Sequence, residues 1–209
     1  MKIGIISDTH GNLAGWDEAM EVALHGSDLI MHCGDLLYHG PKFAPADGYD
    51  PLGLAGRVNE SAVPVLIARG NADADVDQLV LEAPVQSPYL FAQIEGLRIL
   101  AAHGHIQPPE ELLPLAQRWR VDLLLTGHLH VPSVARHEGA LHVNPGTVTY
   151  PLATEEALRR RTCAAWEDGT VRHFDVETGE VLECGWYRAT IDGLEARRYE
   201  RNDVAVSVP

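Results

Sequence analysis

The chain contains few cysteines and no long apolar run, and both features exclude classes of protein. Its 3 cysteines, Cys33, Cys163 and Cys184, lie far apart and form no C-x-x-C pair. This spacing argues against a disulfide framework and against a structural zinc site, so we expect reduced thiols that pack as small hydrophobic side chains. No run of about 18 apolar residues is present, and Met1 and Lys2 lead directly into a short apolar run. We therefore expect neither a membrane span nor a secretory signal, and we expect a cytoplasmic protein.

Basic residues are also scarce. The 209 residues include 16 Lys and Arg against 30 Asp and Glu, which gives a formal net charge of -14. Such a charge repels a polyanion, so high-affinity binding to duplex nucleic acid is not expected. The basic run Arg159 to Arg161 is usually a solvated face in such a sequence. With 45% apolar residues, the length favours a single domain over residues 1–209, in which about 189–209 form an extra edge strand or a C-terminal tail.

Five short apolar runs are separated by helical patterns in the first part of the chain. The runs are rich in Val, Ile and Leu and span residues 3–6, 29–33, 63–68, 97–102 and 121–126. Runs of this length are typical of strands buried on both faces. Apolar spacing and helix-start residues predict four helices, at residues 13–24, 51 to about 60, 75–81 and 113–119. The last of these places Pro114 in an opening turn, where proline is tolerated.

Turn dipeptides dominate the region after Pro132. Glu138-Gly139, Asp168-Gly169 and Thr178-Gly179 each separate short runs of strand-forming residues, and residues 182–187 alternate as a half-buried strand does. We interpret this region as a second, antiparallel sheet. The whole pattern predicts an α/β fold, a four-layer αββα sandwich of two mixed β-sheets flanked by helices.

Each of the five apolar runs is followed by residues of the types that bind metals in proteins. The carboxyl ends of neighbouring strands meet at one edge of a sheet, so these residues are expected to build one shared site. Carboxylates, a carboxamide and imidazoles are the ligands that hold ions able to activate water on a phosphate ester. We predict a two-metal hydrolytic centre, with Asp35 as the carboxylate shared by both ions. The predicted ligands are Asp8, His10, Asp35, Asn71, His103, His128 and His130.

The order of these motifs carries a family resemblance. The set D-x-H, G-D, G-N, H and G-H-x-H, with Gly34 to Pro41, Arg69 to Asp73 and Asn144 to Thr147, resembles the calcineurin-like metallophosphoesterase superfamily. Within it the chain is most similar to the YfcE-type bacterial phosphodiesterases, and the likeness runs from Met1 to about Pro151. The resemblance implies the same four-layer fold and a small phosphorylated substrate. It is also compatible with a homo-oligomer.

The resemblance also implies how two divalent ions are held. One ion would be bound by Asp8, His10, Asp35 and His130, and the other by Asp35, Asn71, His103 and His128. Manganese is the expected metal, and iron, nickel or zinc would suit the same ligands.

One position departs from the wider superfamily and bears on the substrate. Many members carry His directly after the G-N pair, whereas this chain has Ala72, which cannot donate a proton. General acid catalysis is typically worth about 100- to 10,000-fold, so we expect phosphodiesters to be better substrates than phosphomonoesters. His39 and His105 are candidates to replace that histidine. They complete the predicted catalytic set with Asp35, Asn71 and His103.

The sequence therefore predicts a binuclear metal-dependent phosphodiesterase that acts by attack of a metal-bound hydroxide. Two alternatives stay open. One is a phosphomonoesterase or nucleotide pyrophosphatase that uses the same metal centre. The other is a non-catalytic scaffold with the same fold, which the complete set of expected ligands disfavours.

Overall fold

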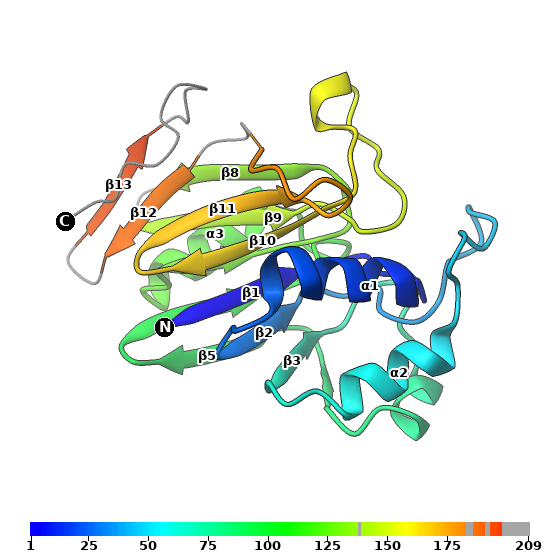
Figure 1. The fold of residues 1–209 in the computed structure, drawn as a ribbon. Helices are drawn as coiled ribbons and strands as arrows, with labels where there is room; N and C mark the ends of the chain where they lie inside the picture. Colours follow the sequence, from blue (N-terminus) through cyan, green and yellow to red (C-terminus); the bar gives the residue numbers. More distant parts are fainter. Residues whose placement is uncertain (138, 183–185, 191–192, 198–209) are drawn as a thin grey trace.

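Two β-sheets lie face to face, and helices cover the outer side of each (Figure 1). The computed structural model describes residues 1–137, 139–182, 186–190 and 193–197. The first sheet has eight strands in the order β13-β12-β11-β10-β1-β2-β3-β4, and the second has five in the order β5-β6-β7-β9-β8. This arrangement confirms the predicted α/β fold with two mixed sheets.

The first sheet is parallel on one side of β1 and antiparallel on the other. Four strands pair in parallel: β1 (Lys2–Ile6), β2 (Leu29–His32), β3 (Val65–Ala68) and β4 (Val85–Gln86). Four antiparallel strands continue the sheet beyond β1: β10 (Thr162–Glu167), β11 (Thr170–Asp175), β12 (Trp186–Thr190) and β13 (Gly193–Arg197). The predicted strand over residues 182–187 is found only from Trp186 onward, and residues 183–185 lie outside the described residues.

The second sheet has a parallel centre and antiparallel edges. The parallel strands are β6 (Leu97–Ala101), β7 (Leu123–Leu125) and β9 (Ala140–Pro145), and the edge strands are β5 (Leu90–Ile94) and β8 (Pro132–His137). The prediction that the region after Pro132 forms a sheet of its own was wrong. Only β8 and β9 join this sheet, whereas β10 pairs with β1 because Cys163 to Trp166 are all buried and suit the interior of a sheet.

Two helices lie over the first sheet and one over the second. The predicted first helix is α1 (Leu13–Ala19), which continues as a π-helical segment over Met20–Leu24, and the second is α2 (Pro51–Asn59). The third predicted helix is a 3-10 helix over Asp75–Leu79, two residues shorter than predicted. Another short 3-10 helix, which was not predicted, covers Glu156–Leu158. No helix among the described residues is both long and apolar enough to cross a membrane.

Helix α3 (Pro109–Arg118) begins four residues before the predicted start at Leu113, so Pro114 lies in its interior. Proline at the first helical position and two acidic residues in the first turn favour the earlier start. Pro114 cannot donate to the carbonyl of Glu110, but both residues are exposed, so water can solvate that carbonyl.

Three apolar clusters hold the layers together. The central cluster joins the inner faces of the two sheets and includes Ile3, Met31, Ile99 and Leu125. A second cluster lies between the first sheet and the helices α1 and α2, and a third lies between the second sheet and α3. The central cluster fixes one sheet on the other, so the carboxyl-end loops of both sheets are held at a common edge.

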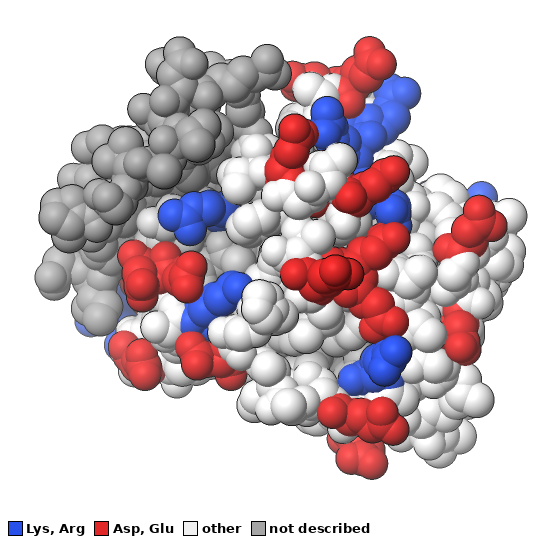
Figure 2. All heavy atoms as spheres, in the orientation of Figure 1, with Lys and Arg blue, Asp and Glu red and all other residues white. Residues whose placement is uncertain are grey.

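The basic run at residues 159–161 is bound to acidic and backbone groups. Arg160 Nη1 lies 3.0 Å from Asp175 Oδ2, Arg161 pairs with Glu18, and Arg159 donates to the backbone carbonyls of residues 153 and 154. On the face in Figure 2, the described Lys and Arg side chains are scattered among Asp and Glu side chains and form no continuous basic patch. These contacts tie the 150–161 loop to β11 through Arg160 and to α1 through Arg161, while Arg159 closes the loop on itself.

Candidate metal centre

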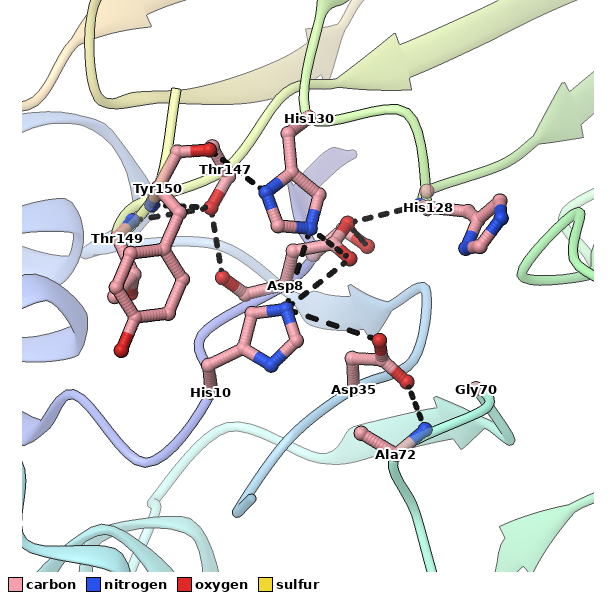
Figure 3. A network of polar contacts seen from close by, with 12 residues as sticks. Asp8, His10, Asp35, Gly70, Ala72, His128, His130, Thr147, Thr149 and Tyr150 are labelled. Atoms are coloured by element: carbon pink, nitrogen blue, oxygen red, sulfur yellow. Dashed lines mark hydrogen bonds and ion pairs between the residues drawn. The ribbon is translucent and has the colours of Figure 1, made fainter. Parts of the chain in front are cut away.

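Loops from both sheets bring the predicted ligands to one edge of the sandwich. Asp8 and His10 follow β1, Asp35 follows β2, and Asn71 follows β3. From the second sheet, His103 follows β6, while His128 and His130 follow β7. In Figure 3 the side chains of Asp8, His10, Asp35 and His130 point toward one another from these separate loops. The site is therefore built between the two sheets.

Three imidazoles are oriented by backbone carbonyl groups. The Nδ1 atoms of His10, His103 and His130 each lie 2.7 Å from the carbonyl oxygens of Tyr38, Cys33 and Tyr150, respectively. An Nδ1–H that donates to a carbonyl fixes the ring and directs the Nε2 atom toward the opposite side. In all three histidines this leaves Nε2 facing the centre of the site, as metal coordination requires.

The Nε2 atoms converge on two carboxylates. His130 Nε2 lies 3.1 Å from Asp8 Oδ1, and His103 Nε2 lies 3.3 Å from Asp35 Oδ2. His10 Nε2 lies 3.7 Å from both of these oxygens (Figure 3). Two groups thus place their ligand atoms within 4.8 Å of one another: Asp8, His10 and His130, and Asp8, Asp35 and His103. Such a cluster of oxygen and nitrogen donors can hold divalent cations.

Burial makes a cation the natural occupant of this cluster. Asp8, His10, Asp35, His103 and His130 are each at most 4% exposed, and Asp8 Oδ1 and His103 Nε2 are buried without a hydrogen-bond partner in the part of the chain that the structure describes. A buried polar atom without a partner is costly, and an unpaired buried charge costs more. A divalent ion between these atoms would satisfy both, so the residues present fit a metal.

The pKa values show how strongly the cluster attracts positive charge. Burial tends to raise the pKa of Asp8, but the charges of His103 and His130 outweigh it and hold that pKa well below its usual range. Burial tends to lower the pKa of His103, yet Asp8 and Asp35 raise it to about 9. The carboxylates that favour a proton on His103 would equally favour a divalent cation, whose binding would displace that proton.

The backbone is bent at most of the predicted ligands. Positive φ angles occur at eight described non-glycine residues, and five of the eight are predicted ligands. A side chain in this left-handed region costs about 1–3 kcal/mol and tends to be retained at functional sites, although Asp and His tolerate it better than most residues. Four of these side chains, those of Asp8, His10, Asp35 and His130, point toward one another, whereas that of His128 is exposed. The five are Asp8 (54°), His10 (47°), Asp35 (59°), His128 (70°) and His130 (56°).

Hydroxyl groups that the sequence did not single out hold the Asp8 loop. Ser7 Oγ donates to Asp8 Oδ2 at 2.6 Å, and Thr147 Oγ1 donates to the Asp8 carbonyl at 2.8 Å. Thr149 Oγ1 donates to the carbonyl of Thr9 at 2.8 Å. The only sequence signal for these contacts was the Asn144 to Thr147 motif, which indicated the family but no role.

Three predicted residues lie on the accessible side of the cluster, and a fourth, His39, lies in the loop after β2. His128 is exposed and its ring centroid lies 5.2 Å from that of His103, while Asn71 is exposed on the loop after β3. The half-buried ring of His105 lies 5.3 Å from that of His103, and His39 packs between Tyr38 and Tyr49. The structure thus gathers five of the seven predicted ligands into one tight cluster, and places His128 and Asn71 beside it.

A glycine permits the close approach of two of the loops. A Cβ atom at Gly70 would lie 2.1 Å from Asp35 Oδ1 and 2.5 Å from the Asp35 nitrogen. We expect Gly70→Ala to lower the free energy of unfolding by about 1–3 kcal/mol, because the added methyl must displace backbone. Urea unfolding measures this change. The matched variant is Gly56→Ala in α2, where the added Cβ would have no neighbouring atom within 4 Å. Its free energy of unfolding should rise by about 0.5–1 kcal/mol, because alanine favours a helix more than glycine does. Equal stability of the two variants would contradict the close approach.

Two stacked mixed sheets with buried carboxylates and imidazoles gathered at their shared edge define a metal-dependent hydrolase. The chain belongs to the calcineurin-like phosphoesterase superfamily, whose domain model matches residues 1–165. The predicted family is therefore confirmed, and the protein is a hydrolase that acts on phosphoesters.

Curated and solved relatives agree with this assignment. The chain is 38% identical over 152 residues to phosphodiesterase YfcE of Escherichia coli (strain K12), a match that covers 72% of this chain and 81% of YfcE. It is 31% identical over 163 residues to a probable metallophosphoesterase of Methanothermobacter thermautotrophicus, covering 76% and 83% of the two chains. The solved structure of YfcE, a phosphoesterase from E. coli, matches with a TM-score of 0.76 and 31% identity over 87% of this chain and 96% of that chain. The predicted similarity to the YfcE type is confirmed as well.

Proposed function

We propose that the chain is a phosphodiesterase with two divalent ions, and that all seven predicted residues are their ligands. The observation that carries this proposal is the convergence of three carbonyl-oriented imidazoles on the buried carboxylates of Asp8 and Asp35. One ion would be held by Asp8, His10, Asp35 and His130. The other would be held by Asp35, Asn71, His103 and His128.

Asp35 would be the ligand shared by both ions. Its Oδ2 atom lies 3.7 Å from His10 Nε2 and 3.3 Å from His103 Nε2, so it faces a ligand of each proposed ion. Its other oxygen accepts from the backbone nitrogen of Ala72 at 2.7 Å, which restrains the carboxylate. A carboxylate between two ions about 3.5–4 Å apart is the usual bridge in two-metal hydrolases.

When bound, two divalent ions supply Lewis acidity toward the phosphate and lower the pKa of water at the site. The residues of the chain hold and orient the reactants. Substrate approaches on the side of Asn71, His128 and His105, because this side is accessible whereas the cluster behind it is buried. His39 and His105 are the proposed proton donors and substrate contacts, and the Nδ1 atom of each is buried without a hydrogen-bond partner among the described residues.

Ala72 supports the choice of phosphodiesters. It lies directly after Asn71, and its backbone nitrogen donates to Asp35 Oδ1 at 2.7 Å, so a histidine at this position would start beside the proposed shared ligand. A phosphomonoester dianion needs more charge neutralisation and protonation than a diester monoanion, and the methyl group supplies neither. Manganese is the proposed metal, with iron, nickel or zinc suited to the same ligands. The cytoplasmic location and a homo-oligomer stay predictions.

The proposal is tested by removing and restoring the metal. We expect the protein stripped with a chelator to lose hydrolysis of an aryl phosphodiester, and two equivalents of Mn²⁺ per chain to restore it. Elemental analysis of the reconstituted protein gives the number of ions, and Fe²⁺, Ni²⁺ and Zn²⁺ are compared in the same assay. Turnover by metal-free protein would contradict the two-metal mechanism.

A substrate panel separates the proposed activity from its alternatives. We expect a higher kcat/KM for the aryl diester than for the matching monoester at saturating Mn²⁺. An equal or higher value for the monoester would instead favour a phosphomonoesterase, and a preference for nucleotide anhydrides would favour a pyrophosphatase. Binding of a protein partner without metal uptake or turnover would favour a scaffold.

A further inference from the structure

A buried carboxylate outside the predicted ligand set connects two of the metal-binding loops. Asp73 is 6% exposed and follows β3 in the same loop as Asn71. Its Oδ2 atom accepts from the backbone nitrogens of Asp35 at 2.8 Å and Gly70 at 2.7 Å. Its Oδ1 atom accepts from the backbone nitrogen of Leu36 at 2.7 Å. One side chain thus binds three backbone N–H groups from two loops.

These contacts exceed what a local turn requires. The bond to Gly70 closes the loop of Asp73 itself, but the bonds to Asp35 and Leu36 reach 38 and 37 residues along the chain to the loop after β2. A further hydrogen bond joins the same two loops in the opposite direction, because the backbone nitrogen of Ala72 donates to Asp35 Oδ1 at 2.7 Å. The two loops therefore hold each other through two carboxylates. Hydrogen bonds from backbone N–H groups to a carboxylate are among the stronger ones in proteins.

The restrained loop includes a strained ligand. Asp35 has a φ of 59°, and such a conformation persists only when the surrounding structure over-determines it. Asp73 accepts from the nitrogen of Asp35 and from that of the next residue, so it fixes the peptide planes on both sides of this bend. The direction of the Asp35 side chain depends on these planes.

We propose that Asp73 is a positioning residue that sets the placement of Asp35 relative to Asn71, and through it the affinity for the ion that these two residues share. This inference rests on the proposed ligand assignment. Groups that orient metal ligands typically change metal affinity by about 10- to 100-fold when they are removed. Asp73 acts through the two loops and does not itself bind the ion.

The test is Asp73→Asn in the full chain, with Mn²⁺ binding measured by titration calorimetry on metal-free protein. An amide retains one acceptor oxygen and turns the other position into a donor that faces a backbone N–H, so at least one loop contact is lost. We expect one of the two Mn²⁺ sites to lose about 10- to 100-fold in affinity. Excess Mn²⁺ should then restore kcat on the aryl diester to near the wild-type value, which lost folding could not explain.

The matched control is Asp77→Asn in the neighbouring 3-10 helix. Asp77 Oδ2 also accepts from one backbone nitrogen, that of Ala74 at 2.7 Å, and the exchange removes the same charge. We expect its Mn²⁺ affinity to equal that of the wild type. Should Asp73→Asn not fold, Asp73→Glu replaces it, because Glu keeps the charge and both acceptors but displaces them by one methylene. We expect that variant to show a smaller loss of affinity for the same ion.

The outcomes distinguish this inference from the proposed function. If the wild-type protein binds no Mn²⁺, the ligand assignment itself is wrong and the inference falls with it. If the wild type binds two ions and the Asp73 variant binds them equally well, or if Asp77→Asn weakens binding as much, only the positioning role is wrong. The inference is supported if only the Asp73 variant loses Mn²⁺ affinity and excess Mn²⁺ restores its kcat.

Discussion

Replacing Asp35 by Asn is expected to lower kcat on an aryl phosphodiester by about a thousandfold or more. Metal-ion stabilisation of a phosphoryl transition state is worth several kcal/mol, and each 1.4 kcal/mol corresponds to a factor of ten in rate. Asp35 Oδ2 faces the Nε2 atoms of both His10 and His103, whereas an amide carries no charge to share between two ions. Loss of this one negative charge should therefore affect both proposed metal sites together.

The measurement combines kcat with the metal content of the purified variant. We expect fewer than two Mn²⁺ ions per chain and an unchanged circular dichroism spectrum. The control is Asp50→Asn, because Asp50 accepts from the backbone nitrogen of Gly53 at 2.8 Å as the N-cap of α2, and Asn caps helices as well as Asp does. That control should retain wild-type activity. Full turnover by the Asp35 variant would show that another residue bridges the ions.

The central part of the fold could be predicted because buried parallel strands leave a clear sequence pattern. Strands β1, β2, β3, β6 and β7 coincide with the predicted apolar runs to within a few residues. Strand β5 was missed because it lies at an edge of its sheet, where buried Leu90 is followed by exposed Phe91 and Gln93. The pairing of β10 with β1 joins residues more than 150 positions apart, and no local pattern indicates such a partner.

The site was predictable in its residue types but not in its supporting contacts. Asp8, Asp35 and His103 could be singled out as candidate ligands because residue types that bind metals follow strand ends in a recognisable order. The carbonyl groups that orient the imidazoles belong to residues such as Cys33, whose side chain has no part in the contact. Asp73 was visible within a motif, yet only the folded chain shows that it accepts from the Asp35 loop. Backbone contacts between distant loops carry no signature in side-chain identity.

The second large effect is expected from Ala72→His, which should raise kcat/KM for an aryl phosphomonoester by about 100-fold, the lower end of the range for general acid catalysis. Ala72 is only half-buried and its backbone nitrogen donates to Asp35 Oδ1 at 2.7 Å, so an imidazole attached here starts beside the proposed shared ligand. It can protonate the leaving oxygen and offset the second negative charge of a monoester. The diester already lacks that charge, so its kcat/KM should change much less.

A second substitution separates proton donation from the filling of space. Ala72→Phe adds a ring of similar shape that can neither donate a proton nor carry a charge, and we expect it to leave the ratio of monoester to diester kcat/KM near the wild-type value. If Ala72→Phe raises monoester hydrolysis as much as Ala72→His does, the methyl group limits the substrate by shape alone. If neither variant changes the ratio, the preference is set elsewhere, and His39 and His105, the proposed proton donors, become the residues to substitute next. A gain confined to His would show that one side chain beside Asp35 decides which phosphate esters this centre hydrolyses.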